Sequence, residues 1–238
     1  MTENTEIELR QERMLHYTMS FIGGIFAIYS LLEHANVFGS AETSNMILLV
    51  KDLLCWDLYH IFIRIGSLAV YAAGIILTIW MDKNSLEIQK RVCILIDCFA
   101  AFVLGILPEN LHPVIALYPV AFAMSIQWCT FRGVRENPSA TTFSTGNFRQ
   151  LITLVFHYVT EKKQENLSRI KFYIITMLSF HAGVATMYLI WPYISKQRHQ
   201  SIWLVILPLL FALIQESLVT VKKGECELVV QNLECEDV

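Results

Sequence analysis

Six apolar runs, each about as long as a lipid bilayer is thick, constrain this chain more than any other feature of its sequence. A helix needs about 20 apolar residues to cross ~30 Å of hydrocarbon, and it satisfies its own backbone hydrogen bonds while doing so. The sequence therefore predicts an all-α polytopic membrane protein with six transmembrane helices. We expect these spans at about 14–32, 59–81, 92–107, 112–130, 170–192 and 201–221.

Composition supports a membrane setting and argues against a nucleic-acid partner. Charged residues make up 16% of the chain, whereas soluble domains carry about 25%. The net charge is −3 and no basic stripe is present, so nucleic-acid binding is not expected. We divide the chain into an N-terminal segment (1–13), one membrane domain (14–220) with halves 14–107 and 112–220, and an acidic tail (221–238).

The distribution of lysine and arginine predicts the orientation of the chain in the membrane. The N-terminal segment is too acidic for a signal peptide, so the first span is expected to be an uncleaved anchor. With the N-terminus in the cytoplasm, the outer segments hold Lys51, Lys196 and Arg198, and Arg64 lies within the second span. The rest of the 18 Lys and Arg fall in inner segments. Because positive charge favours the inside, we expect both termini in the cytoplasm.

Two polar stretches of similar design interrupt the apolar runs. They read "GSAETSNMILLV" (39–50) and "SATTFSTGNFRQLI" (139–152), and each follows the first span of a triplet of spans. Aligning Asn45 with Asn147 also pairs Thr43 with Thr145, and Ser44 falls opposite a glycine. Three spans are an odd number, so the two motifs enter the membrane from opposite sides. This arrangement predicts a 3+3 inverted repeat.

Each polar motif is expected to start a short helix. The apolar runs that follow are too short to span a bilayer, so each helix is either re-entrant or lies in the membrane interface. Ser, Thr and Asn are good N-caps, and we expect Asn147 to cap the second short helix. Helical spacing also places four polar residues of this helix on one face: Arg149, Thr153, His157 and Thr160.

The two motifs carry a resemblance to a known family. The stretch "VFGSAETSNMILL" (37–49) resembles a signature of the YoaK family of bacterial membrane proteins, typically "VFANAQTGN" followed by apolar residues. The stretch "QWCTFRGVRENPSATTFSTGNFRQL" (127–151) is similar to the second signature, around "ATTMCTGN". Motif order, spacing and the six-span layout agree over about 12–220. The family is defined by a domain of unknown function, so the resemblance implies this fold and the bacterial plasma membrane, and no substrate.

This chain departs from the family pattern at three places. Ala27 stands where many members have an aspartate, and Glu42 stands where the first motif usually has glutamine. The first motif also reads Thr-Ser-Asn (43–45) where the family has Thr-Gly-Asn. A role that rests on the missing aspartate therefore does not carry over, although Glu42 is a candidate to replace part of its charge.

Among the ionisable residues inside the expected spans, Arg64, Asp97, His181 and Glu216 are the main candidates, since charge at that depth is costly and often functional. For Asp97 three roles are open. It forms a buried ion pair with Arg64 of the adjacent span, it relays protons or cations, or it faces a water-filled vestibule without a specific role. For His181 we expect a hydrogen bond to a neighbouring helix rather than catalysis or metal ligation. Glu216 lies near the inner end of the sixth span.

The cysteines predict no metal site, disulfide framework or cofactor. The chain has six cysteines and no CxxC pair, and those beside apolar runs usually behave as small hydrophobes. Cys226 and Cys235 each lie in an "ECE" triplet of the tail. We interpret this tail as a solvated acidic segment, with a soft-metal hook as the alternative.

The leading functional hypothesis is a small-solute permease or channel-like transporter with its site near the membrane midplane. Paired helix N-termini favour an anion or a polar neutral solute, whereas the Glu42 and Asp97 carboxylates favour coupled protons or a cation. The candidate pore-lining residues are Glu42, Thr43, Ser44, Asn45, Thr145, Gly146, Asn147, Thr153 and His157.

Two other classes of function remain as alternatives. One is a non-catalytic scaffold or accessory subunit, and the other is a membrane-embedded enzyme. HExxH, GxSxG and P-loop motifs do not occur in the sequence, so an enzyme is not expected. The expected partners are the bilayer and a small polar or ionic solute, and a homodimer is the alternative to a pore built from one chain.

Overall fold

The chain folds almost entirely into helices. This computed structural model describes residues 3–33, 42–83, 85–108, 110–162 and 164–220. The expected acidic tail and the first residues of the earlier polar stretch lie outside them. The elements are α1 (Glu3–Glu33), α2 (Thr43–Leu54), α3 (Leu58–Met81), α4 (Leu86–Ile106), α5 (Pro113–Ala116), α6 (Tyr118–Thr130), β1 (Gly133–Val134), β2 (Asn137–Pro138), α7 (Thr145–Glu161), α8 (Glu165–Ile194), the 3₁₀ helix η1 (Ser195–Val205) and a final helical segment, 206–220.

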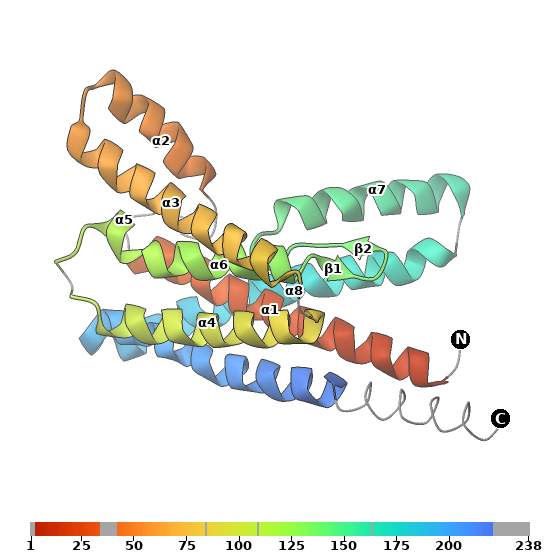
Figure 1. The fold of residues 1–238 in the computed structure, drawn as a ribbon. Coiled ribbons are helices and arrows are strands. Elements are labelled where there is room, and N and C mark those ends of the chain that lie inside the picture. The colour runs from red at the N-terminus through yellow and green to blue at the C-terminus, as the bar shows by residue number, and fades with distance from the viewer. Residues whose placement is uncertain (1–2, 34–41, 84, 109, 163, 221–238) are drawn as a thin grey trace.

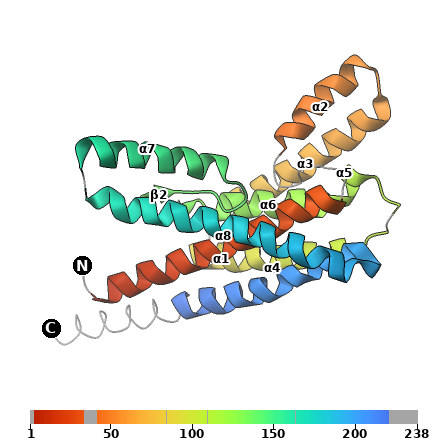
Figure 2. The ribbon, with the colours of Figure 1, turned by 180° about the vertical axis from the view of Figure 1, so that it is seen from behind.

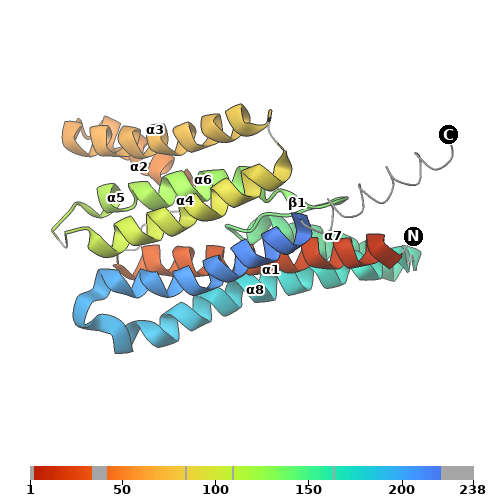
Figure 3. The same cartoon turned by 60° about the horizontal axis from the view of Figure 1, so that its bottom comes forward.

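The helices form layers whose long axes run in similar directions. Figure 3 shows α3 in one layer, α4 with α5 and α6 in the next, and α1 and α8 with the final helix in a third. The short helices α2 and α7 project from this bundle toward opposite ends (Figure 1). From behind, both start near the middle of the molecule and run outward (Figure 2).

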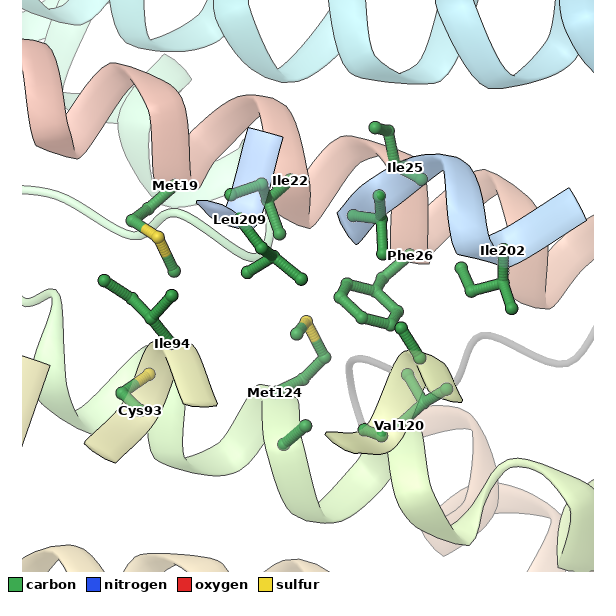
Figure 4. Close-up of a cluster of buried hydrophobic side chains, with 14 of the residues drawn as sticks. Met19, Ile22, Ile25, Phe26, Cys93, Ile94, Val120, Met124, Ile202 and Leu209 are labelled. Atoms are coloured by element: carbon green, nitrogen blue, oxygen red, sulfur yellow. The ribbon is translucent and has the colours of Figure 1, made fainter. Parts of the chain in front are cut away.

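An apolar core joins α1, α4, α6 and the final helix. Met19 and Phe26 of α1 contact this core together with Ile94, Met124 and Leu209, and all five side chains are essentially fully buried (Figure 4). Each such side chain gains roughly 1.5–3 kcal/mol when it leaves water. In a bilayer the same contacts act through close packing rather than through dehydration.

The two longest helices, α1 and α8, cross with their backbones in contact. A Cβ placed on Gly183 would lie 2.0 Å from the carbonyl oxygen of Phe21, and one on Gly24 would lie 2.0 Å from that of Phe180. Glycine is thus required on both sides of the crossing. Small residues of this kind let membrane helices approach closely.

The pattern of helix packing repeats in the two halves of the chain. Helix α2 packs on α3, and α7 packs on α8. Helix α3 then packs on α6, which is the first long helix of the second half. In the same way, α8 packs on α1, the first helix of the first half.

Four helices of the described residues are long and apolar enough to cross a membrane: Glu6–Glu33, Leu58–Met81, Glu165–Ile194 and Gln200–Thr220. They coincide with four of the six expected spans. The third expected span lies in α4, which also carries Lys90, Arg91 and Asp97. The fourth is divided into the four-residue α5 and the 13-residue α6. Six spans and an inverted repeat therefore stay predictions.

The boundary expected at residue 13 does not interrupt the chain's helical structure. Helix α1 starts at Glu3 and continues without a break to Glu33. The polar first turns and the apolar remainder therefore form one continuous helix, because nothing in the sequence between them breaks the backbone hydrogen-bond pattern.

Candidate functional site

The first motif starts α2, and its asparagine is locked in a buried network. Helix α2 begins at Thr43, so Asn45 is its third residue, and Asn45 is only 4% exposed. Its Nδ2 donates to Glu42 Oε2 at 2.9 Å and to Ser67 Oγ of α3 at 3.2 Å. Ser67 Oγ in turn donates to Glu42 Oε1 at 2.8 Å. These bonds tie the start of α2 to the middle of α3.

Arg64 of α3 completes this network. Its Nε donates to Asp52 Oδ2 at 2.6 Å and its Nη1 donates to Asn45 Oδ1 at 3.0 Å. The hydrogen bond from Arg64 lowers the pKa of Asp52 below its usual value. Of the three alternatives for Asp97, the ion pair with Arg64 is therefore wrong, because the guanidinium pairs with Asp52 of the neighbouring helix α2.

The second motif starts α7, and its asparagine binds residues that precede the helix in the sequence. Asn147 Oδ1 accepts from Ser139 Oγ at 2.9 Å and from the Ala140 N–H at 3.1 Å. Its Nδ2 donates to the Ala140 carbonyl at 2.7 Å. The expectation that Asn147 caps α7 is wrong, because Ser144 is the N-cap and makes no side-chain cap bond. The asparagine instead holds the segment that precedes the helix.

Both motifs adopt the same register at the start of a helix. Thr43 and Thr145 are the first residues of α2 and α7, and each asparagine is the third. Both asparagines are buried, whereas the two preceding positions in each helix are exposed. The alignment that paired these residues in sequence thus also pairs them in local structure.

A cavity of about 380 Å³, here called the α7 cavity, opens beside the second motif. A Cβ added to Gly146 would meet nothing within 4 Å, so this helix start leaves open space. The rings of Trp128 and Phe143 form one wall, with their centroids 5.7 Å apart. The charged residues of its lining are Arg132 and Arg149. Together with the positive end of the helix dipole, they suit an anion or a polar neutral molecule.

Beyond Arg149, the polar stripe of α7 lies on the exposed surface and takes no part in the lining of this cavity. Thr153 Oγ1 donates to the Arg149 carbonyl at 3.0 Å, and His157 Nδ1 lies 2.7 Å from Glu161 Oε1. Both side chains are exposed. An apolar stripe beside them is also exposed and consists of Phe148, Ile152, Val155, Phe156 and Val159.

Asp97 is fully buried in α4 without a charged partner among the described residues. Its Oδ1 atom has no hydrogen-bond partner there, and the Cys93 thiol lies 4.0 Å from Oδ2. The relay and vestibule interpretations of Asp97 therefore stay open predictions.

The other two candidates, His181 and Glu216, both have partners among the described residues. His181 is exposed, and its Nδ1 lies 2.7 Å from the Met177 carbonyl of the same helix. The expected bond to a neighbouring helix is therefore wrong, because α8 supplies the partner itself. Glu216 is buried and pairs with Arg91 at the start of α4. This pair fixes the end of the final helix against α4.

Several residues of the two networks are absent from the sequence-based site. Asp52 and Ser67 bind the first motif, and Ser139 and His16 join the second. Their signal in the sequence is weak, since one polar side chain among apolar neighbours does not identify its partner. Among the described residues, no group of three or more His, Cys, Asp or Glu could hold a metal ion.

The fold and the two motif networks define a helical protein with several apolar helices, consistent with a polytopic membrane protein. Comparison with known families then gives a specific match: residues 15–220 match the family described as protein of unknown function DUF1275. The chain belongs to this family. No curated protein and no solved structure matches it.

Proposed function

We propose that this chain is a permease or channel-like transporter for a small anionic or polar neutral solute, and not an enzyme. The observation that carries this proposal is the pair of short helices, α2 and α7, that start in the same register and project toward opposite ends of the bundle. Half-helices whose N-termini meet a solute between two inverted halves are a recurrent transporter design.

The repeated packing pattern supports an inverted repeat of six spans. Exchange of the two halves maps the α3–α6 contact onto the α8–α1 contact. At 12 and 17 residues, α2 and α7 are about 18 and 26 Å long, less than the ~30 Å of hydrocarbon. This length fits a re-entrant helix, whereas the exposed apolar and polar stripes of α7 fit an interfacial one.

The solute site belongs to the α7 cavity rather than to the asparagine side chains. The hydrogen-bonding groups of Asn45 and Asn147 are already engaged by the protein. The N–H groups at the start of α7 and the guanidinium groups of Arg132 and Arg149 lie beside open space instead. This arrangement favours an anion or a polar neutral solute over a cation.

Flux into proteoliposomes tests the proposal with a pair of variants at one position. Gly146→Ala adds a methyl group that meets nothing, so it should retain flux of succinate, an anion, or of xylitol, a polar neutral probe. Gly146→Trp fills the α7 cavity and should abolish that flux while the melting temperature stays near that of the wild type. Wild-type flux of both probes equal to that of empty liposomes, or unchanged flux in Gly146→Trp, contradicts the proposal.

We further propose a bacterial plasma-membrane location with both termini in the cytoplasm. This topology places the loop after α2 outside, where Cys55 is a free, exposed thiol. A membrane-impermeant maleimide added to intact cells should label the wild type, and Cys55→Ser should abolish the label. Labelling of Cys55 only after the cells are broken would show that the chain has the opposite orientation.

A scaffold or accessory-subunit role is the second candidate, and the exposed apolar stripe of α7 favours it. A stripe of this kind can pack against lipid, a second copy or another subunit. Absence of flux together with stoichiometric co-purification of one membrane partner would support this role over the permease.

A further inference from the structure

A second cavity, outside both motifs, contains a buried histidine with an unsatisfied nitrogen. This cavity, here called the α1–α4 cavity, has a volume of about 440 Å³ and lies where α1, α4 and α6 meet β1. It shares Cys129 and Arg132 with the α7 cavity, so the two are neighbours. Its polar lining includes Glu12, His16, Asp82, Gln89, Lys90 and Arg135.

The hydrogen bonds of the second motif determine which nitrogen of His16 carries the hydrogen. The Ala140 N–H can only donate and its carbonyl can only accept, so their bonds orient the Asn147 amide with Oδ1 toward Ser139. The single hydroxyl hydrogen of Ser139 is then directed at Asn147 Oδ1. Ser139 Oγ must therefore accept from the N–H of His16 Nε2, 3.0 Å away.

The remaining ring nitrogen of His16 is an unpaired acceptor. His16 is 1% exposed, and a charged imidazole without a partner is costly at such a position. In the neutral ring with its hydrogen on Nε2, Nδ1 has a lone pair and no hydrogen. This atom has no partner among the described residues. A ligand that donates a hydrogen bond would satisfy it.

The lining of the same cavity holds more cations than carboxylates, and one of the cations, Arg132, pairs with Asp82 at 3.5 Å. Lys90, Arg132 and Arg135 line it, against the two carboxylates Glu12 and Asp82. Gly133 has a φ of 129°, and a Cβ there would lie 2.1 Å from the Asn137 carbonyl oxygen, so the tight β1–β2 turn requires glycine. The two arginines next to this turn, Arg132 and Arg135, are exposed residues of the cavity lining.

We propose that the α1–α4 cavity binds a phosphate group that carries its own hydroxyl donor. The cations attract the charge, and His16 Nδ1 accepts a hydrogen bond from the P–O–H of hydrogen phosphate or from a hydroxyl attached to a phosphate headgroup. The two sources share this chemistry: free phosphate, or an anionic lipid such as phosphatidylglycerol. The site is distinct from the α7 cavity and does not depend on transport.

The comparison of phosphate with sulfate tests the acceptor directly. Sulfate resembles phosphate in size and charge but carries no hydrogen near neutral pH, so it would leave His16 Nδ1 facing another acceptor. A site built to accept a hydrogen bond discriminates strongly against a ligand that lacks the donor. Calorimetric titration of the full chain in lipid-free detergent should give at least about tenfold tighter binding of phosphate than of sulfate. Equal affinities, or tighter sulfate binding, would overturn the role of His16.

Variants of the cations test the location of the site. Lys90 and Arg135 line this cavity and not the α7 cavity. Loss of one charge-assisted hydrogen bond should weaken phosphate binding about tenfold or more in Lys90→Gln or in Arg135→Asn. Asn is chosen because Arg135 has a φ of 50°, which Asn tolerates. Arg10→Gln, an exposed charge outside the cavity, is the matched control and should bind like the wild type.

A separate measurement tests whether the bound phosphate group belongs to a lipid headgroup. Native mass spectrometry of the chain from mixed micelles should show retention of phosphatidylglycerol over phosphatidylcholine, whose headgroup has no hydroxyl donor. The Lys90 and Arg135 variants should reduce that retention if the headgroup occupies this cavity. Free phosphate binding without lipid retention identifies the soluble ligand, and absence of both overturns the proposal. Since no flux is measured, a failure here leaves the permease test unaffected.

Discussion

The two motifs start their helices in the same register but hold them by different chemistry. Asn45 is bound by two residues of charged type, Glu42 and Arg64, and by the Ser67 hydroxyl. Asn147 is bound by the hydroxyl of Ser139 and by the backbone of Ala140. The first helix start therefore depends on charge and on protonation, whereas the second depends on neutral hydrogen bonds. A shared motif thus specifies a helix start and leaves the supporting partners free to differ.

The largest effect is expected where the first network loses its cation. Arg64→Met leaves Asp52 and Glu42 as buried carboxylates, and should lower the free energy of unfolding by about 3–5 kcal/mol. Lys51→Met is the matched control, because Lys51 also pairs with Asp52, at 3.6 Å, but is 66% exposed. It should cost about 0–1 kcal/mol. Equal losses in denaturant titrations of the two variants would show that burial of the charge does not matter.

Truncation of the two asparagines compares the networks directly. Asn45→Ala should cost about 3 kcal/mol, because bonds to charged groups are the stronger ones. Asn147→Ala should cost about 2 kcal/mol, since its partners are neutral. The same titrations measure both values, and a larger loss for Asn147 would remove the distinction between the two networks.

A fall in pH should affect the stability contributions of the two networks differently, and this difference should be smaller than those caused by the substitutions above. The pKa of Asp52 is lowered in the folded chain by its hydrogen bond from Arg64, relative to an unfolded value of about 3.9. The folded state then binds fewer protons, so this contribution is complete above about pH 4 and is lost as the pH falls through the folded pKa. Asp52→Asn should flatten the fall in melting temperature below pH 4, and Asn147→Ala should leave its slope unchanged. A steeper fall in Asp52→Asn would contradict this assignment.

The smallest effect is expected at the second position of each helix. Gly146→Ala should raise the free energy of unfolding by about 0.5 kcal/mol, because alanine restricts the unfolded chain and its methyl group meets nothing in the folded one. Ser44→Ala should change it by less than about 0.5 kcal/mol, as is usual for an exposed site. A clear destabilisation by Gly146→Ala would mean that the start of α7 is more tightly packed than its open surroundings indicate.

Much of the helical architecture was predictable from the sequence, and the residue partners were not. The apolar runs at 14–32, 59–81, 170–192 and 201–221 coincide with helices long enough to cross a bilayer. The run at 112–130 divides after Ala116, where Pro119 lies just beyond the division and removes a backbone donor from the first turn of α6. Hydropathy averages over such a run and does not register one missing hydrogen bond.

The candidate site shows the same limit. The common register of Thr43 and Thr145 was visible in the alignment of the motifs, because helix starts depend on neighbouring residues. The pairing of Arg64 with Asp52 was not visible, because it depends on how α2 folds back on α3. His16 gave no local signal at all, and its link to Ser139 crosses 123 residues of sequence.

The sequence by itself determined an all-α chain of apolar helices and the presence of a short helix at each polar motif. Both follow from short-range physics: hydrocarbon requires internal backbone hydrogen bonds, and polar residues interrupt apolar runs where helices start. Only the tertiary structure decided which side chains satisfy one another. It paired Arg64 with Asp52, left Asp97 without a charged partner among the described residues, and left His16 with an unpaired acceptor beside a cavity lined by three cations and two carboxylates. These outcomes depend on which helix faces which, and that choice is made by packing across the whole chain.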